Sequence, residues 1–353
     1  MKGKFVTVKL MLNPATPNNT HKEKILPIGG QAVIEGVMMR SPDRVATAVR
    51  RANGHITLRI QEYRSLFQRY KWLNIPIIRG AIMLVEVMML GIQHLNFSAD
   101  VAMQDLEDLE KQKGNASGKS SSSKGMNTLR TVLTVSLALI AGLALFFALP
   151  LFAATHLFTL EREALTFNLV TGLIRIILFL AYVYAISFLR DVGRLFQYHG
   201  AEHKTIYAFE KQLELTVANI RRQPRLHPRC GTSFLVMVML IALLFFALVD
   251  TLIMQFYGHI NLVIRLVTHL PLVPILGGIS YEAIKASAKR PDHPLVKMLI
   301  FPGLALQRIT TREPDDAMLE VAVVAMKAAL GEPYEHLLPR QNESTAVSTQ
   351  SFL

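Results

Sequence analysis

Long apolar stretches dominate the chain between residues 131 and 279. Four of them approach or exceed the length needed to cross a hydrocarbon layer of roughly 30 Å, given about 1.5 Å per helical residue. They cover residues 131–154, 169–188, 234–254 and 260–279. Arg175 interrupts the second stretch, and the fourth contains Arg265, His269 and two prolines. We interpret these stretches as four transmembrane helices within a membrane domain at residues 131–280.

The region before the apolar stretches begins with a predicted β-containing head at residues 1–74. Residues 45–51 and 55–63 flank the dipeptide Asn53-Gly54, which is favoured in two-residue type I′ hairpin turns. A glycine-rich segment, residues 28–42, precedes this hairpin. Its paired glycines either allow close approach of the backbone to a ligand or occupy turns, and we favour turns.

Two further segments separate this head from the membrane domain. Residues 75–97 are apolar but contain Arg79, Glu86 and His94, which favours a helix lying at the membrane surface rather than crossing it. Residues 98–130 are first acidic and then rich in serine, which is typical of a flexible linker.

The chain after the membrane domain is predicted to be a cytoplasmic helical region at residues 281–340, followed by a disordered tail at 341–353. Residues 317–330 have the pattern of an amphipathic helix. Asp315 and Asp316 precede it, where acidic side chains interact favourably with the helix dipole.

The charge distribution predicts how the chain lies in the membrane. The net charge is +12, from 38 Lys and Arg residues against 26 Asp and Glu. Of these cations, 19 precede the first span, 8 lie between the second and third, and 8 follow the fourth, so 19 + 8 + 8 = 35 fall on one side. The positive-inside rule makes that side the cytoplasm, with both termini there. Membrane orientation therefore accounts for the basicity, and the bilayer, rather than nucleic acid, is the predicted partner.

Most candidate site residues lie in the loop at 189–233. His199, Glu202 and His203 form an H-x-x-E-H pattern, the inverse of the H-E-x-x-H motif of zinc proteases. If residues 201–211 are helical, the two histidines lie one turn apart on the same face and can bind one metal ion. Glu202 is then the predicted general base, acting on water whose pKa the metal lowers towards 7.

Further candidate ligands lie nearby in the sequence. His227 and Cys230 add an imidazole and a thiolate, which suit zinc and similar divalent metals. Glu282, after the fourth span, is a further candidate ligand or a partner that orients an imidazole. Cys230 is the only cysteine, so an internal disulfide is excluded. A structural polar network, with Cys230 as a small buried residue, remains an alternative interpretation.

Five long motifs resemble those of the YqhQ-like bacterial membrane proteins, a family of unassigned function that has been labelled a predicted metal-dependent enzyme. The resemblance covers residues 28–330 and rests on IGGQAVIEGVMMRSP, YHGAEHKTI, HPRCGTSF, GGISYEAIK and PGLALQRITTREPDDAMLEVA. It implies a bacterial cytoplasmic membrane protein, but no substrate or reaction. The matching polar positions are Gln31, Glu35, His199, Glu202, His203, His227, Cys230, Glu282 and Glu313.

Together these observations predict an α-helical polytopic membrane protein with a small β-containing cytoplasmic N-terminal region and interfacial helices. We expect a zinc-dependent hydrolase at the cytoplasmic face, acting on a membrane-associated peptide or lipid-linked substrate. A non-catalytic scaffold with a structural metal is the first alternative, because two histidines, Cys230 and His227 would close all four zinc positions. A transporter is the second, because prolines and glycines interrupt the fourth span near His269.

Overall fold

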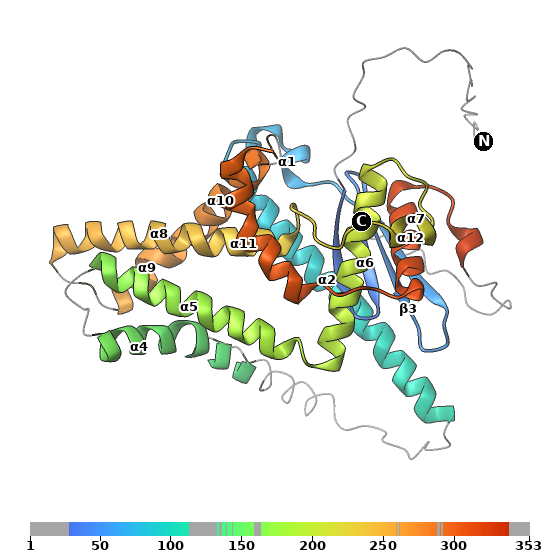
Figure 1. The fold of residues 1–353 in the computed structure, drawn as a ribbon, viewed down its shortest axis with the longest axis horizontal. Helices are drawn as coiled ribbons and strands as arrows, with labels where there is room; N and C mark the ends of the chain where they lie inside the picture. The colour runs from blue at the N-terminus through green and yellow to red at the C-terminus, as the bar shows by residue number, and fades with distance from the viewer. Residues whose placement is uncertain are drawn as a thin grey trace, which may run out of the picture.

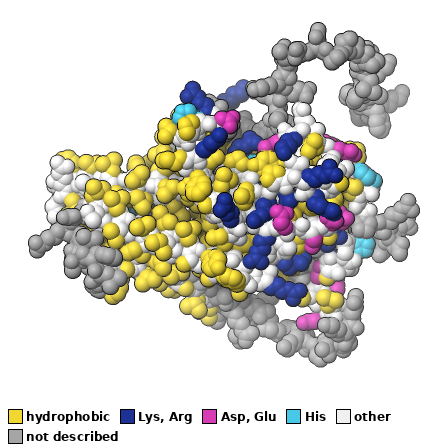
Figure 2. Space-filling view, in the orientation of Figure 1, with side chains coloured by type: hydrophobic (Ala, Val, Ile, Leu, Met, Phe, Trp, Pro, Cys, Tyr) yellow, Lys and Arg dark blue, Asp and Glu magenta, His cyan; other side chains and the backbone are white. Residues whose placement is uncertain are grey.

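A computed structural model describes residues 28–112, 164–258, 262–287 and 292–338, most of 133–158, and residues 260 and 290. Helices predominate, and a small sheet lies on one side of the molecule, away from the long apolar helices (Figure 1). Figure 2 shows apolar side chains covering the end formed by these helices, whereas charged side chains gather around the sheet. The chain thus separates into an apolar helical part and a polar part.

The sheet is an antiparallel meander in the order β1-β2-β3-β4. Its strands are β1 (Gly29–Val33), β2 (Gly36–Arg40), β3 (Arg44–Arg50) and β4 (Ile56–Glu62). The predicted pair of strands around residue 53 is confirmed as β3 and β4, which pair from Arg44↔Glu62 to Arg50↔Ile56. Gly29 and Gly30 lie within β1 rather than in a turn, so the preferred interpretation of these glycines was wrong.

The β3–β4 connection differs from the predicted two-residue turn. Gly54 N–H donates to Arg51 O at 2.9 Å, and Arg51 N–H donates to His55 O at 2.8 Å. Gly54 has a φ of 84°, whereas Asn53 has no positive φ. A type I′ turn needs positive φ at both central residues, so this loop is the three-residue form with a left-handed glycine in a bulge.

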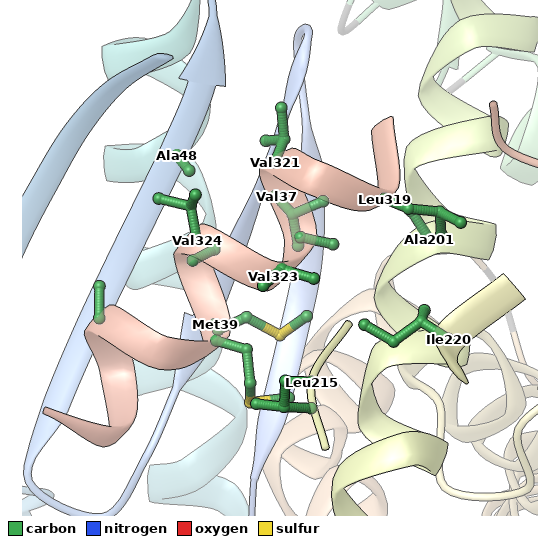
Figure 3. Packing of buried hydrophobic residues seen from close by; sticks show 14 of the residues in the cluster. Val37, Met39, Ala48, Ala201, Leu215, Ile220, Leu319, Val321, Val323 and Val324 are labelled. Carbon is green, nitrogen blue, oxygen red and sulfur yellow. The ribbon is translucent and has the colours of Figure 1, made fainter. Parts of the chain in front are cut away.

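A hydrophobic core joins the sheet to two helices, α6 (Arg190–Glu210) and α12 (Asp316–Leu330). Figure 3 shows Val37 and Met39 of β2 facing Val323 and Val324 of α12, with Ala201 of α6 beside them. The predicted helix at 317–330 is confirmed as α12. Its N-cap Asp315 accepts a hydrogen bond from Met318 N–H at 2.8 Å, and Gly331 ends it with a φ of 75°.

Among the described residues, four helices are long and apolar enough to cross a membrane. Three of these candidate spans coincide with the second, third and fourth predicted stretches. The second is α5 (Ala164–Ile186) and the third is α8 (Gly231–Tyr257). The last consists of α9 (Leu262–His269), η3 (Leu270–Leu272) and α10 (Val273–Ser287), which follow one another directly. The remaining candidate span is α2 (Ile78–Gln112). The predicted stretch at 131–154 lies partly outside the described residues, and its described part includes a π-helix, η2 (Ala144–Ala148), and the start of α4 (Leu149–Phe158).

The observed extent of α2 corrects one predicted boundary, and its contacts explain why it contains polar residues. It continues to Gln112, so residues 98–112 are helical rather than linker, whereas residues 113–130 lie outside the described part. Glu86 accepts hydrogen bonds from the Ser65 hydroxyl and from Leu66 N–H, at the start of α1 (Leu66–Arg69). Glu86 of α2 therefore binds the head, while Met88 and Met89 are exposed.

The remaining elements surround the junction of the two parts. They are η1 (Lys71–Leu73), α7 (Val217–Arg221), α11 (Pro294–Thr310) and η4 (Glu335–Leu337). Helix α11 packs against the first turns of α8, where a Cβ at Gly303 would lie 2.7 Å from the Cα of Ser233. This close approach brings the C-terminal end of α11 to the beginning of α8.

The contact between α2 and the sheet generates a stability prediction. The His94 ring is fully buried and lies 2.7 Å from the Thr47 hydroxyl and 2.6 Å from the Gln61 amide. His94→Ala removes both partners and leaves a cavity, so we expect a loss of about 2–4 kcal/mol in the free energy of unfolding. Gln93→Ala, at an exposed position of the same helix, should change it by less than about 0.5 kcal/mol. Equal thermal unfolding midpoints of the two purified variants would contradict this account.

Candidate metal centre

Helix α6 carries three of the predicted site residues. It spans residues 190–210, so the condition set on the H-x-x-E-H pattern is met. His199 and His203 are one turn apart, and their ring centroids are 4.4 Å from each other. Both imidazoles therefore lie on one face of the helix, as predicted.

Cys230 reaches the same place from the start of a different helix. It is the N-cap residue of α8, and its Sγ accepts a hydrogen bond from Thr232 N–H at 3.4 Å. Ligand atoms of His199, His203 and Cys230 all lie within 4.8 Å of one another, and His199 Nε2 is 3.1 Å from Cys230 Sγ. About thirty residues separate these groups in the sequence, so the loop through α7 returns the chain to α6.

The hydrogen bonds of the two imidazoles determine which nitrogens face the thiol. His199 Nδ1 lies 2.8 Å from Thr310 O, and His203 Nδ1 lies 2.5 Å from Arg225 O. A carbonyl oxygen only accepts, so both Nδ1 atoms carry a proton and donate it. In the neutral rings, both Nε2 lone pairs are then free to bind a metal, which is the arrangement of histidine ligands oriented by backbone carbonyls.

The environment of the His203 Nε2 atom is the feature that most favours a bound metal. His203 is 1% exposed, and this nitrogen has no hydrogen-bond partner among the described residues. A buried polar atom without a partner is unfavourable, and metal coordination is one way to satisfy it. The donor set of two imidazole nitrogens and one sulfur suits zinc. The residues present therefore fit a metal ion.

The electrostatic environment favours the protonation states that ligands require. Burial lowers the pKa of His203, which keeps its imidazole neutral. Burial raises the pKa of the Cys230 thiol, but the adjacent His203 imidazole and the Thr232 hydroxyl and backbone outweigh this effect and lower it overall. The position of Cys230 at the N-terminus of α8 also stabilises a thiolate, because helix N-termini favour negative charge.

Glu202 lies beside the cluster, on the side of the sheet. Its side chain is 5% exposed and packs against Gly30 of β1, and its carboxyl group is hydrogen-bonded to the backbone of Ala32. Burial raises the pKa of this carboxyl group to about 8, although the nearby His199 opposes the shift. Glu202 is thus a buried carboxyl group next to the three candidate ligands.

His227 is close to the cluster but takes part in another network. Its ring centroid is 5.7 Å from that of His203, yet its Nε2 faces Glu210 at 3.4 Å and its Nδ1 accepts from Arg229 N–H at 3.3 Å. The structure therefore does not bring His227 into the ligand set. With both ring nitrogens engaged, His227 supports the loop that carries Cys230.

Glu282 lies outside the cluster of His199, His203 and Cys230, so the structure does not bring this predicted ligand or orienting partner to the site. It lies on α10 and forms an ion pair with Arg79 of α2, with Arg79 Nη2 2.5 Å from a carboxylate oxygen. That pair holds the C-terminal half of α10 against the first turn of α2. The end of the fourth span is thus beside α2 rather than α6.

The other three predicted polar positions lie around α6 without joining the ligand set. Gln31 packs against Gly91 of α2. Glu35 forms an ion pair with Arg194 of α6, and Glu313 pairs with Lys204 at 2.8 Å and with Arg225 at 3.5 Å. The contacts of Glu35 and Glu313 connect α6 to the sheet and to the segment before α12, whereas that of Gln31 connects the sheet to α2.

Two contributions to the site were missed in the sequence analysis. The carbonyls of Thr310 and Arg225 orient the imidazoles, and backbone groups carry no signal in a sequence. Gln307 was also missed: it is fully buried, accepts from His227 N–H at 2.7 Å and donates to His227 O at 2.8 Å. A glutamine directly after the apolar run at residues 298–306 was the available signal for it.

Comparisons with known proteins agree with the resemblance of the motifs. A family model described as "Protein of unknown function (DUF1385)" matches residues 75–332. The Uncharacterized protein YqhQ of Bacillus subtilis (strain 168) is 35% identical over 324 residues, which are 88% of this chain and 94% of that protein. No solved structure matches the chain. Since the family model covers well over half of the sequence, the chain belongs to the DUF1385 family of proteins of unassigned function.

Proposed function

We propose that this chain is a metal-dependent hydrolase of the bacterial cytoplasmic membrane, acting at the cytoplasmic face on a membrane-associated peptide or lipid-linked substrate. One observation carries the proposal: the Nε2 atoms of His199 and His203 converge on Cys230 Sγ, while both Nδ1 atoms are held by backbone carbonyls. A structural polar network would not explain why the buried Nε2 atom of His203 has no hydrogen-bond partner among the described residues. The cluster lies where α8 begins, next to the apolar helices.

The proposed topology has both termini in the cytoplasm, with residues 131–154 as the first of four spans. Helix α2 is then an interfacial helix, because from His94 onwards it contacts the sheet. The sixteen residues from Ile78 to Gln93 cover only about 24 Å, which is less than the hydrocarbon layer of roughly 30 Å. This arrangement keeps 35 of the 38 Lys and Arg residues on one side.

The ligand set favours catalysis over a purely structural metal. Catalytic zinc sites use three protein ligands and leave one position open, whereas structural sites close all four. His227, the expected fourth ligand, is directed to Glu210 instead. Zinc bound here would activate water and polarise a substrate carbonyl or phosphoryl group. His199, His203 and Cys230 would hold the ion, and Glu202, whose pKa a bound cation would lower again, would take up and return the proton.

A scaffold with a structural metal is the second candidate, and a transporter is the third. The scaffold is favoured by the burial of the site, since His203 and Glu202 are nearly inaccessible. The polar residues that suggested a transporter bind one another, because His269 lies 2.8 Å from Asp250 and Arg265 lies 3.1 Å from it. Because these three residues pair with one another, they give no specific support to transport.

The topology predicts which residues are accessible from outside the cell. In a Cys230→Ser background, a cysteine engineered at position 161, outside the described residues, should react with a membrane-impermeant maleimide in intact cells. The matched cysteine at exposed Asn53 should react only after permeabilisation. Labelling at position 161 only after permeabilisation would overturn the four-span topology.

The ligand assignment predicts metal content. Purified wild-type protein should contain about one zinc ion per chain, and His203→Ala should lose it because a third of the ligand set is gone. His227→Ala should keep the metal, since its ring nitrogens are bound elsewhere. Acidification should release the ion as protons compete for the ligands. Metal content is measured by elemental mass spectrometry, and equal content in both variants would refute the assignment.

The enzyme and scaffold proposals differ in what Glu202→Gln does. This change keeps the size of the side chain but removes its ability to accept a proton, and a general base contributes typically about 10²–10⁴-fold in rate. We expect normal abundance and metal content together with accumulation of the uncleaved substrate. Comparative mass spectrometry of lipids and membrane peptides, in cells whose own copy is replaced, detects this accumulation. Identical profiles for Glu202→Gln and wild type would leave the scaffold as the surviving candidate.

A further inference from the structure

One glycine of β1, Gly30, lies directly against the side chain of the candidate general base, Glu202. A Cβ atom built at Gly30 would lie 2.7 Å from Glu202 Cγ, 2.9 Å from Glu202 Cδ and 2.9 Å from Glu202 Oε1. Carbon atoms in folded proteins do not approach this closely, so any side chain at position 30 would displace the carboxyl group. At Gly29, by contrast, a Cβ would meet no described atom within 4 Å.

The Glu202 side chain has little room to move if it is displaced. It is 5% exposed and lies between β1 and the candidate ligands on α6. Helix α6 itself cannot retreat, because a Cβ at Gly200 would lie 2.1 Å from Arg312 O on its other neighbour. The position of the carboxyl group is therefore determined by how closely the backbone of β1 approaches α6.

We propose that Gly30 is a positioning residue, through which β1 holds the Glu202 carboxyl group beside His199 and Cys230. The expected effect of Gly30 on turnover rests on the proposed function, whereas the contact between Gly30 and Glu202 does not. The contact with Glu202, rather than a turn, then explains why the IGGQ segment contains paired glycines. The second glycine is required because a glutamate from another element occupies the space of its side chain, whereas the first is not required for this purpose.

The matched pair Gly30→Ala and Gly29→Ala tests the proposal in the full-length protein. Neither glycine has a positive φ, so alanine meets no backbone strain at either position. Both variants should keep wild-type abundance and zinc content, because the three ligands are untouched. Gly30→Ala should reproduce the substrate accumulation of Glu202→Gln, with turnover reduced at least about 10²-fold, while Gly29→Ala should behave as wild type.

A residue with only a structural role would give a different result, because its loss would lower abundance and metal content together with turnover. Wild-type turnover of Gly30→Ala, in cells where Glu202→Gln accumulates substrate, overturns the proposal. Equal impairment of Gly29→Ala and Gly30→Ala overturns it as well.

A thermal double-mutant cycle tests the contact without reference to metal or activity. Gly30→Ala should lower the unfolding midpoint in the wild-type background. In the Glu202→Ala background it should leave the midpoint unchanged or raise it, because the atoms nearest to the new methyl group are gone and alanine restricts the unfolded chain more than glycine does. This non-additivity supports the proposal even if Glu202→Gln is fully active, in which case only the hydrolase proposal fails. Additive midpoints overturn it.

Discussion

The close approach of the segment at residues 310–313 to helix α6 is the contact on which the rest of the site depends. Arg312 N–H donates to Phe196 O at 2.8 Å, and Gly200 lets the Arg312 carbonyl reach the helix surface. Thr310 O is thereby placed at the Nδ1 atom of His199. A side chain larger than hydrogen at position 200 would push this segment away. The tautomer of His199 therefore depends on a glycine one residue further along the chain.

The same segment connects the two physical environments of the chain. On one side it ends α11, which packs on α8 and whose Gln307 binds the backbone of His227 and the Ser233 hydroxyl. On the other side it leads into α12, which covers the sheet. Apolar burial holds each part together, and it also joins α2 to the sheet around Val101, whereas the contacts of the segment at 310–313 are polar. The candidate metal centre lies at this join, where the first turn of an apolar helix meets a buried polar face.

How far the sequence could predict this arrangement depended on how local each feature is. Helical spacing was enough to place His199 and His203 on one face, and Cys230 was found because thiol and imidazole groups are scarce and occur here close together. Glu282 was misplaced because its position depends on where α10 ends relative to α2, which is a tertiary contact. The extent of α2 was underestimated for a related reason. Its polar residues look unsuitable for a long apolar helix until their partners in the head are known.

The glycines show that a motif can be recognised in the sequence although its physical cause lies in a distant element of the fold. Gly30 and Gly200 stand in two different motifs, and neither has a backbone conformation that only glycine adopts. Each is instead explained by an atom from a distant element, Glu202 for the first and Arg312 for the second. Gln307 of a third motif binds His227 of a fourth in the same way. Motifs separated by 80 residues or more thus meet on or beside α6. Because each supplies the space or the hydrogen bond that another requires, a substitution in any of these four motifs is expected to alter the positions of His199 and His203.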